Sequence, residues 1–210
     1  FRDGSVWCEV AGGDIYFTGG FGRGISNEVV RVSESSFEVT QMSPMLSAIA
    51  YHGSVYYNNY LYVIGGYTYR CERLLVSDDR WETLSPLPYT ASLINAVVLK
   101  NAQCIYAIGG GDMGGSMDII VRLSLGRLEW DLIPLNLPFA ASDVACFTQG
   151  ESKVWFVVKG KLYCLNDETE GTMTFIKQVG RIKSICGPSY YHRGSLYYSN
   201  NEGAANRLEV

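Results

Sequence analysis

The chain has 210 residues, of which 47% are hydrophobic and 18% charged, so it can bury a substantial core and is globular rather than disordered. Its net charge is −4 and its 17 Lys and Arg are scattered, which argues against a nucleic-acid partner because there is no basic stripe to neutralise phosphates. The longest apolar runs are strand-sized and fall short of the roughly 20 residues of a membrane-spanning helix, so we expect no membrane partner.

A short apolar strand that ends in Gly-Gly occurs three times, at residues 14–20, 60–66 and 104–110. Weaker copies without the glycines occur at residues 153–157 and 195–198. The copies align on a central aromatic residue with spacings of 46, 44, 49 and 42 residues, at Tyr16, Tyr62, Tyr106, Trp155 and Tyr197. A period of this length is typical of repeat architectures.

Each copy has the same surroundings, which predict four antiparallel strands per repeat. An extended run precedes the aromatic strand across a short polar turn, at residues 6–10, 50–57, 93–99, 144–147 and 188–191. A variable loop follows the glycines and leads to a third strand, at 28–32, 73–76 and 118–123. We expect a fourth strand to hold an aromatic residue, at Phe37, Trp81, Trp130 and Phe175. Proline-containing segments end these fourth strands, and no helical periodicity is visible, so the fold class is all-β.

These residues resemble the kelch repeat family, whose motif joins a hydrophobic strand, Gly-Gly, a variable stretch and a Trp followed by a Pro-rich segment. The match is most specific at Gly65-Gly66 with Trp81 and at Gly109-Gly110 with Trp130. The resemblance implies a β-propeller of four-stranded antiparallel blades, with Trp81 and Trp130 buried between blades. The copy at Gly19-Gly20 has Phe37 in the place of the Trp, and the last two copies lack the diglycine.

We expect residues 1–210 to form one partial kelch β-propeller, with blades near 1–46, 47–88, 89–138, 139–180 and 181–210. About four and a half blades are then present, and residues 206–210 form a third strand without a fourth. Kelch propellers usually have six or seven blades, so we expect this to be part of a six-bladed ring in a chain that continues further.

The six cysteines are dispersed without a CxxC pair, at Cys8, Cys71, Cys104, Cys146, Cys164 and Cys186. Most lie in apolar runs, which favours free, buried thiols and a cytoplasmic protein over disulfides. The sequence offers no Asn-x-Ser/Thr sequon, which points weakly in the same direction.

Two motif-like segments are better explained as loops. Residues 109–114 satisfy GxGxxG after a strand, but residues 116–125 are a β-like run and not the helix that a dinucleotide site requires. Asn166, Glu168, Glu170 and Gly171 mimic the start of a calcium loop, yet Lys177 stands where a bidentate Glu is needed.

The alternative function is a propeller enzyme similar to the copper-radical oxidases, which requires two His and two Tyr at one site. The only histidines are His52, expected in the first strand of blade 2, and His192, expected in a turn of blade 5, so they should point to different places. We therefore expect no catalytic residue, no cofactor and no metal.

The favoured function is a non-catalytic scaffold or substrate-recognition module that binds partner proteins. Kelch members of this kind serve as ubiquitin-ligase adaptors or as cytoskeletal proteins in the cytoplasm. The loops after Gly-Gly and the loops that lead to the next blade should share one face of the propeller and present residue types that are enriched at interfaces. The expected partner-binding residues are Phe21, Arg23, Tyr67, Tyr69, Arg70, Tyr89, Asp112, Met113 and Phe139.

Overall fold

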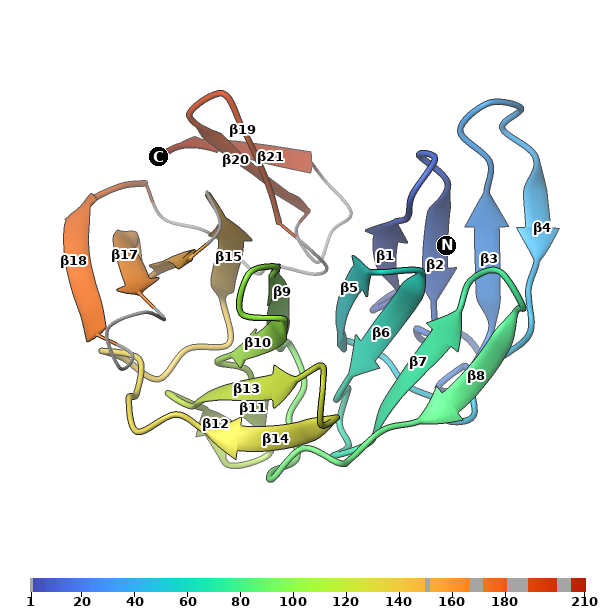
Figure 1. Ribbon diagram of the computed structural model, residues 1–210, viewed down its shortest axis with the longest axis horizontal. Helices are drawn as coiled ribbons and strands as arrows, with labels where there is room; N and C mark the ends of the chain where they lie inside the picture. The colour runs from blue at the N-terminus through green and yellow to red at the C-terminus, as the bar shows by residue number, and fades with distance from the viewer. Residues whose placement is uncertain (1, 150–151, 167–171, 181–188, 200–204) are drawn as a thin grey trace.

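The computed structural model describes residues 2–149, 152–166, 172–180, 189–199 and 205–210, and within these ranges it consists of strands and their connections (Figure 1). Within them, no helix is long and apolar enough to cross a membrane. The prediction of an all-β protein is therefore confirmed.

Five small antiparallel sheets follow one another along the chain and surround a common centre, in the arrangement of a β-propeller (Figure 1). Their inner strands are β1, β5, β9, β15 and β19, and successive inner strands contact one another. The sheets, called blades 1 to 5 below, are β1 (Val6–Glu9), β2 (Ile15–Thr18), β3 (Val29–Val32) and β4 (Val39–Gln41); β5 (Gly53–Tyr57), β6 (Tyr60–Ile64), β7 (Cys71–Leu75) and β8 (Arg80–Thr83); β9 (Asn95–Leu99), β10 (Cys104–Ile108), β13 (Ile120–Ser124) and β14 (Glu129–Leu132); β15 (Val144–Thr148), β16 (Lys153–Val158), β17 (Lys161–Asn166) and β18 (Thr172–Gln178); and β19 (Tyr190–His192), β20 (Ser195–Ser199) and β21 (Ala205–Glu209).

The number of blades is close to the expected four and a half, since the structure has four four-stranded sheets and a fifth with three strands. The predicted third strand at the end of the chain is present as β21, which pairs with β20. A separate hairpin, β11 (Gly111–Asp112) with β12 (Gly115–Ser116), is inserted between β10 and β13.

The second strands of blades 2 and 3, β6 and β10, bury alternate side chains against the two neighbouring blades, as the two-residue period of a strand requires. In β6, Leu61 and Val63 belong to the core shared with blade 1, whereas Tyr62 and Ile64 belong to the core shared with blade 3. The face of a blade that packs on the preceding blade is called its front face below. Every position of β6 is apolar because blade 2 has a neighbouring blade on each side, which covers both faces of its sheet.

The two tryptophans of the repeat lie between blades, as predicted. Trp81 in β8 is 8% exposed, and its Nε1–H donates to the carbonyl of Ser43 at 2.9 Å. Trp130 in β14 is half-buried and donates in the same way to the carbonyl of Ser85 at 3.0 Å. Each indole thus tethers its blade to the segment that leaves the preceding blade.

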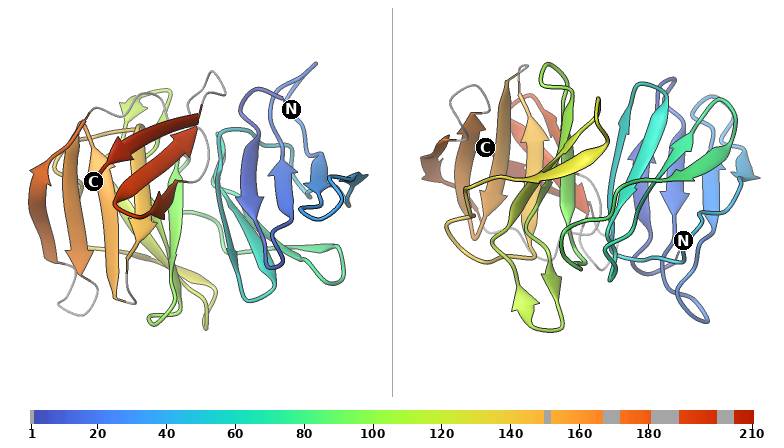
Figure 2. Two further views of the ribbon diagram at one scale, coloured as in Figure 1. Left: turned by 90° about the horizontal axis from the view of Figure 1, so that it is seen from above. Right: turned by 60° about the horizontal axis from the view of Figure 1, so that its bottom comes forward.

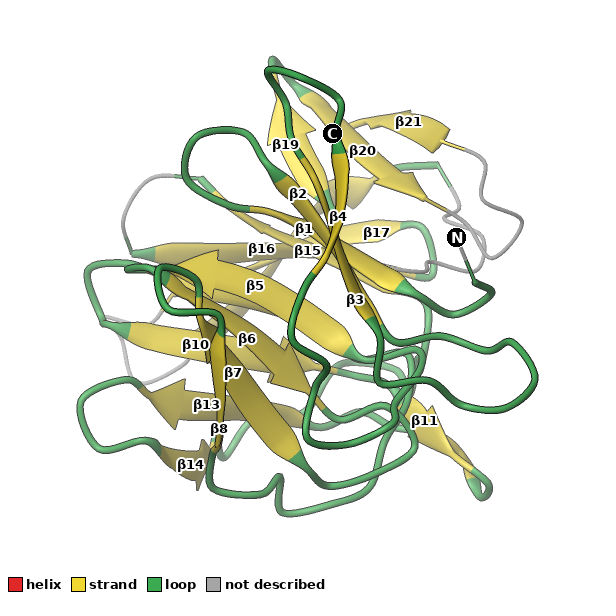
Figure 3. Cartoon of the chain, turned by 90° about the vertical axis from the view of Figure 1, so that its right-hand side faces the viewer, coloured by secondary structure: helices red, strands yellow, loops and turns green. Residues whose placement is uncertain are grey.

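Phe37 does not occupy the Trp position in blade 1, so this prediction was wrong. It lies in the turn before β4 with a φ of 55°, and its side chain is 80% exposed. The counterpart of Trp81 is Val39, because Val39 pairs with Val32 as Trp81 pairs with Leu74. Both pairs are seven positions apart (32 and 39, 74 and 81), so the two turns have the same length, and Phe37 lies in the turn because it stands two positions before Val39. Figure 3 is seen from the side of blade 1 and shows β4 in front of β3.

Blade 4 joins its second and third strands by a tight turn instead of a diglycine loop. Val158 pairs with Lys161, which leaves Lys159 and Gly160 as the two turn residues, both with positive φ (47° and 75°). Such a two-residue hairpin keeps β16 and β17 paired to their ends, so these two strands are joined without the long loop that follows the glycines in blades 1 to 3. Phe175 does lie in the fourth strand β18, as predicted.

Candidate functional site

Two sets of connections meet at one end of the propeller, called the loop end below (Figure 2). The post-glycine loops are residues 19–28, 65–70 and 109–119, and the exit segments, which lead from a fourth strand to the next blade, are residues 42–52, 84–94 and 133–143. The second glycine of each pair donates its N–H to the exit segment of the same blade, at 2.9–3.1 Å; the pairs are Gly20 with Ile49, Gly66 with Ala91 and Gly110 with Ala141. The two sets of loops are thereby tied together into one surface.

The diglycine is required by backbone angles and by space. Gly66 has a φ of 95°, and a Cβ at this position would lie 2.8 Å from the backbone oxygen of Ala50 in the preceding exit segment. Only glycine adopts this conformation without strain and leaves room for the neighbouring chain. The glycines therefore fix where the loops leave the sheets.

Three aromatic rings contact one another on the loop end of blades 1 and 2. The ring of Tyr51 lies 5.7 Å from that of Phe21 and 6.0 Å from that of Tyr67, and the rings of Phe21 and Tyr67 are 6.4 Å apart. The hydroxyl of Tyr51 donates to Asp3 at 2.9 Å, and Tyr67 remains 52% exposed. These three rings, called the aromatic cluster below, form a packed base with one exposed member. Tyr51 was missed from the sequence because it was assigned to a strand.

The loops that carry Phe21 and Tyr67 also carry exposed side chains of the expected kind. Tyr69 is 52% exposed, and Arg23 and Arg70 are also exposed. The guanidinium of Arg70 donates to the hydroxyl of Ser47 at 3.0 Å, which holds it over the first exit segment. The two loops therefore present one further aromatic ring and two cations beside the residues of the cluster in the sequence.

Asp112 and Met113 lie on the β11–β12 hairpin, which projects from the loop end of blade 3 (Figure 2, right). Met113 at its tip is fully exposed, and the carboxylate of Asp112 accepts the N–H of Gly114 at 2.7 Å. This hairpin projects at the same end of the propeller as the aromatic cluster.

Tyr89 and Phe139 are less available than the sequence suggested. Tyr89 is half-buried against the core between blades 2 and 3, and burial raises the pKa of its hydroxyl. The ring of Phe139 is also half-buried and is covered by the ammonium groups of Lys159 at 5.2 Å and Lys161 at 4.9 Å. Both residues support the exit segments more than they extend the exposed surface.

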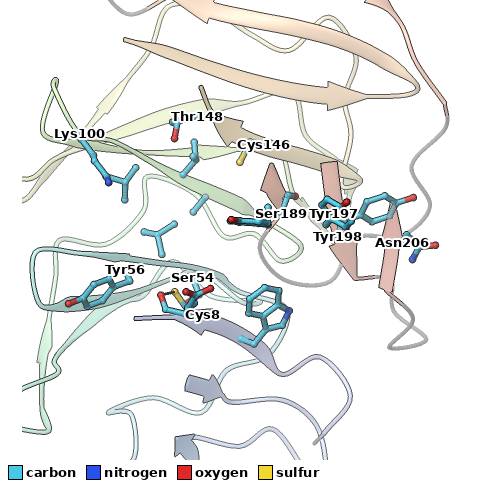
Figure 4. A pocket seen from close by; sticks show the side chains of 17 residues that line it. Cys8, Ser54, Tyr56, Lys100, Cys146, Thr148, Ser189, Tyr197, Tyr198 and Asn206 are labelled. Carbon is cyan, nitrogen blue, oxygen red and sulfur yellow. Dashed lines mark hydrogen bonds between the residues drawn. The ribbon is translucent and has the colours of Figure 1, made fainter. Parts of the chain in front are cut away.

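An open central cavity of about 520 Å³, which the sequence did not reveal, is lined by the inner strands and by residues of β20 and β21 (Figure 4). Among its lining residues are Cys8, Ser54, Lys100 and Cys146. Burial raises the pKa of the Cys8 thiol to about 12, and it also raises the pKa of the Cys146 thiol. Both thiols are therefore protonated near neutral pH and are poor nucleophiles. The cavity is therefore lined by apolar side chains, neutral thiols and hydroxyls, together with the ionisable side chains of Glu9 and Lys100.

The two histidines lie at opposite ends of the inner strands. His52 directly precedes β5 at the loop end, is 2% exposed and shares a hydrogen bond of 2.7 Å between its Nε2 and the hydroxyl of Thr18. Burial lowers the pKa of His52 to about 3. His192 ends β19, is exposed and stacks on Tyr190, with ring centres 6.2 Å apart.

The structure contains no group of three or more His, Cys, Asp or Glu suited to a metal within the ranges it describes. Three of the calcium-loop-like residues, Glu168, Glu170 and Gly171, lie outside those ranges, as does Cys186. The other five cysteines are free and buried. No protein-family model matches the chain, and no curated protein matches it.

Proposed function

We propose that the protein is a non-catalytic recognition module that binds partner proteins through the loop end of its propeller. The observation that carries this proposal is the aromatic cluster of Phe21, Tyr51 and Tyr67, whose loops also carry exposed Tyr69 and Arg23 and are tied to the sheets. A rigid scaffold that presents Tyr and Arg on ordered loops lowers the entropic cost of binding.

The chemistry of this surface suits a protein partner. Tyrosine and arginine dominate interface hot spots because they combine a large apolar area with hydrogen-bonding groups. The exposed Met113 on its projecting hairpin adds an adaptable apolar contact at the same end. Tyr67, Tyr69 and Arg70 form the centre of the proposed surface, and Met113 lies at its edge.

We further propose that the repeats are divergent kelch repeats within a six-bladed ring and that the protein acts in the cytoplasm. Within that family the function is that of a substrate adaptor for ubiquitin ligases or of a cytoskeletal scaffold. The buried free thiols and the tryptophans between blades support this proposal.

The proposal of a non-catalytic protein rests on the placement of the histidines. His52 is buried between blades 1 and 2 at the loop end, and His192 lies at the other end of the inner strands. An oxidase-like copper site requires its ligands to share one geometry, which these two positions do not offer.

The test is a selection of binding peptides from a displayed library of intracellular protein fragments, followed by affinity measurements with purified chain. We expect the double variant Tyr67→Ala/Tyr69→Ala to bind the selected peptides at least about tenfold more weakly, as for loss of hot-spot side chains. Phe37→Ala is the matched control, because Phe37 is an 80% exposed aromatic residue at the opposite end. Selected peptides that lose affinity with Phe37→Ala but not with the double variant would place the binding surface elsewhere.

A further inference from the structure

Each exit segment inserts two apolar side chains, four residues apart, into the core between its own blade and the next. All of them are buried, and they belong to the cores that join blades 1 and 2, blades 2 and 3, and blades 3 and 4. The pairs are Met45 with Ile49, Leu87 with Ala91 and Leu137 with Ala141. The repeat thus includes a wedge that covers the front face of the following blade.

The contact of this wedge is most direct on blade 2. The backbone N–H of Leu46 donates to the carboxylate of Glu72 in β7 at 2.8 Å, and Glu72 is only 3% exposed. The neighbouring Met45 is 1% exposed and shares a core with Val63 of β6. The first exit segment therefore lies across the front face of blade 2 beside β6 and β7.

Residues 2–5 run along blade 1 in the register of the last part of an exit segment. The carbonyl of Gly4 accepts the N–H of Tyr51 at 2.9 Å, and the carbonyl of Tyr51 accepts the N–H of Leu93 at 2.7 Å. All three residues have a positive φ, of 66°, 53° and 56°. Because Arg2 stands two residues before Gly4, as Ile49 stands two before Tyr51, Arg2 is the counterpart of the second wedge residue.

The repeat would place the first wedge residue four positions before Arg2, and blade 1 has a groove at the surface that this residue would cover. This groove has a volume of about 320 Å³ and is lined by Arg2, Ser5, Phe17, Gly19, Glu28 and Val30. Val30 pairs with Phe17 of β2 and with Gln41 of β4. Glu72 occupies the same register position between β6 and β8, so Val30 is its counterpart. In blade 2 the corresponding surface is covered by the segment that carries Met45.

The same front face of blade 1 is exposed where its counterparts are buried. Val39 is 67% exposed, whereas its counterpart Trp81 in blade 2 is 8% exposed. At the rim of the groove, Arg2 is already held by an ion pair with Glu28 at 2.7 Å. The groove thus has the apolar side chains of Phe17 and Val30 in its lining and an ion pair at its rim.

We propose that this groove binds an extended segment of the exit-segment type and that the segment places a leucine or methionine side chain in it, four residues before the position of Arg2. The occupant has the chemistry of residues 84–89, Leu-Ser-Pro-Leu-Pro-Tyr, whose second leucine is the first wedge residue on blade 3. The proline before this leucine favours the extended backbone that the wedge requires.

The test joins a copy of residues 84–89 directly to the N-terminus of the full chain, which places the copy of Leu87 four residues before Arg2. We expect the melting temperature to rise by about 3–6 °C, because a leucine side chain becomes buried in a chain of this size. Backbone amides of β3 should also exchange with deuterium more slowly. The matched control is the same extension with aspartate in place of that leucine, which should give neither effect.

A second pair of variants distinguishes binding of the extension in the groove from a stabilising effect of the extension that does not involve the groove. Val30→Lys in the extended chain should remove the gain in melting temperature, whereas Leu132→Lys, at a 67% exposed site on the outer strand of blade 3, should keep it. Equal melting temperatures and exchange rates for the leucine and aspartate extensions would overturn the proposal. So would a dimer of the unextended chain, seen by light scattering and dissociated by Val39→Lys, because the occupant would then be a second copy.

Discussion

Replacing the buried His52 should change how the stability of the protein depends on pH. The ring is 2% exposed, its Nε2 is paired with the hydroxyl of Thr18, and its Nδ1 has no hydrogen-bond partner within the described part of the chain. Its pKa is lowered to about 3 by burial, against about 6.5 in an unfolded chain. As pH falls below about 6.5, the unfolded state takes up a proton that the folded state does not, so folding becomes less favourable.

The size of this effect follows from the two pKa values. As far as His52 determines it, the free energy of unfolding is highest above about pH 6.5 and falls progressively as the pH approaches 3. Between pH 7 and pH 5 the loss is about 2 kcal/mol, since each pH unit below the unfolded pKa costs about 1.4 kcal/mol. This window lies above the range in which most carboxylates titrate.

The assay is urea unfolding of the wild-type chain and of His52→Gln at pH 7, 6 and 5. The free energy of unfolding of the wild type should fall by about 2 kcal/mol more than that of the variant over this range, whatever the difference between them at pH 7. His192→Gln, at an exposed histidine, is the matched control and should follow the wild type. Equal losses of stability in the wild type and in His52→Gln would contradict a lowered pKa of His52 in the folded protein.

Two further substitutions test how the blades are joined. Trp81→Phe should lower the free energy of unfolding by about 2–4 kcal/mol, because it leaves the Ser43 carbonyl without its donor and opens a cavity, while Val39→Phe at the exposed counterpart should stay within about 0.5 kcal/mol; urea unfolding measures both. Gly66→Ala should cost about 2 kcal/mol or more, since the new methyl group meets the Ala50 carbonyl, whereas Gly24→Ala projects into open space and should be nearly neutral in thermal unfolding.

The sequence predicts the sheets well because the repeat carries its own physical markers. The aromatic residue of each second strand, from Tyr16 to Tyr106, is buried on the side that packs against the next blade. Gly65 and Gly66 mark the point where a strand must end at positive φ, and Trp81 identifies the outer strand. These features are local in sequence, so one copy can be aligned with the next.

The surface was harder to predict because it depends on which blades are neighbours. Phe37 fits the motif by residue type, but it stands two positions before Val39, the counterpart of Trp81, and is exposed in the turn. Tyr51 contributes to the aromatic cluster from a residue with a left-handed backbone, which no pattern of apolar residues shows. The central cavity is lined by residues of all five blades and has no signature within any single repeat.

The hydrogen bonds of the two tryptophans have a direction along the chain that bears on how the protein is made. Trp81 bonds to a residue 38 positions earlier, and Trp130 to one 45 positions earlier. During synthesis, each outer strand therefore leaves the ribosome after the carbonyl that it will bind. A blade can dock on its predecessor as soon as its own last strand emerges, and no partner yet to be translated is needed. This order keeps each loop closure short and limits the time for which an apolar sheet face is exposed in the growing chain.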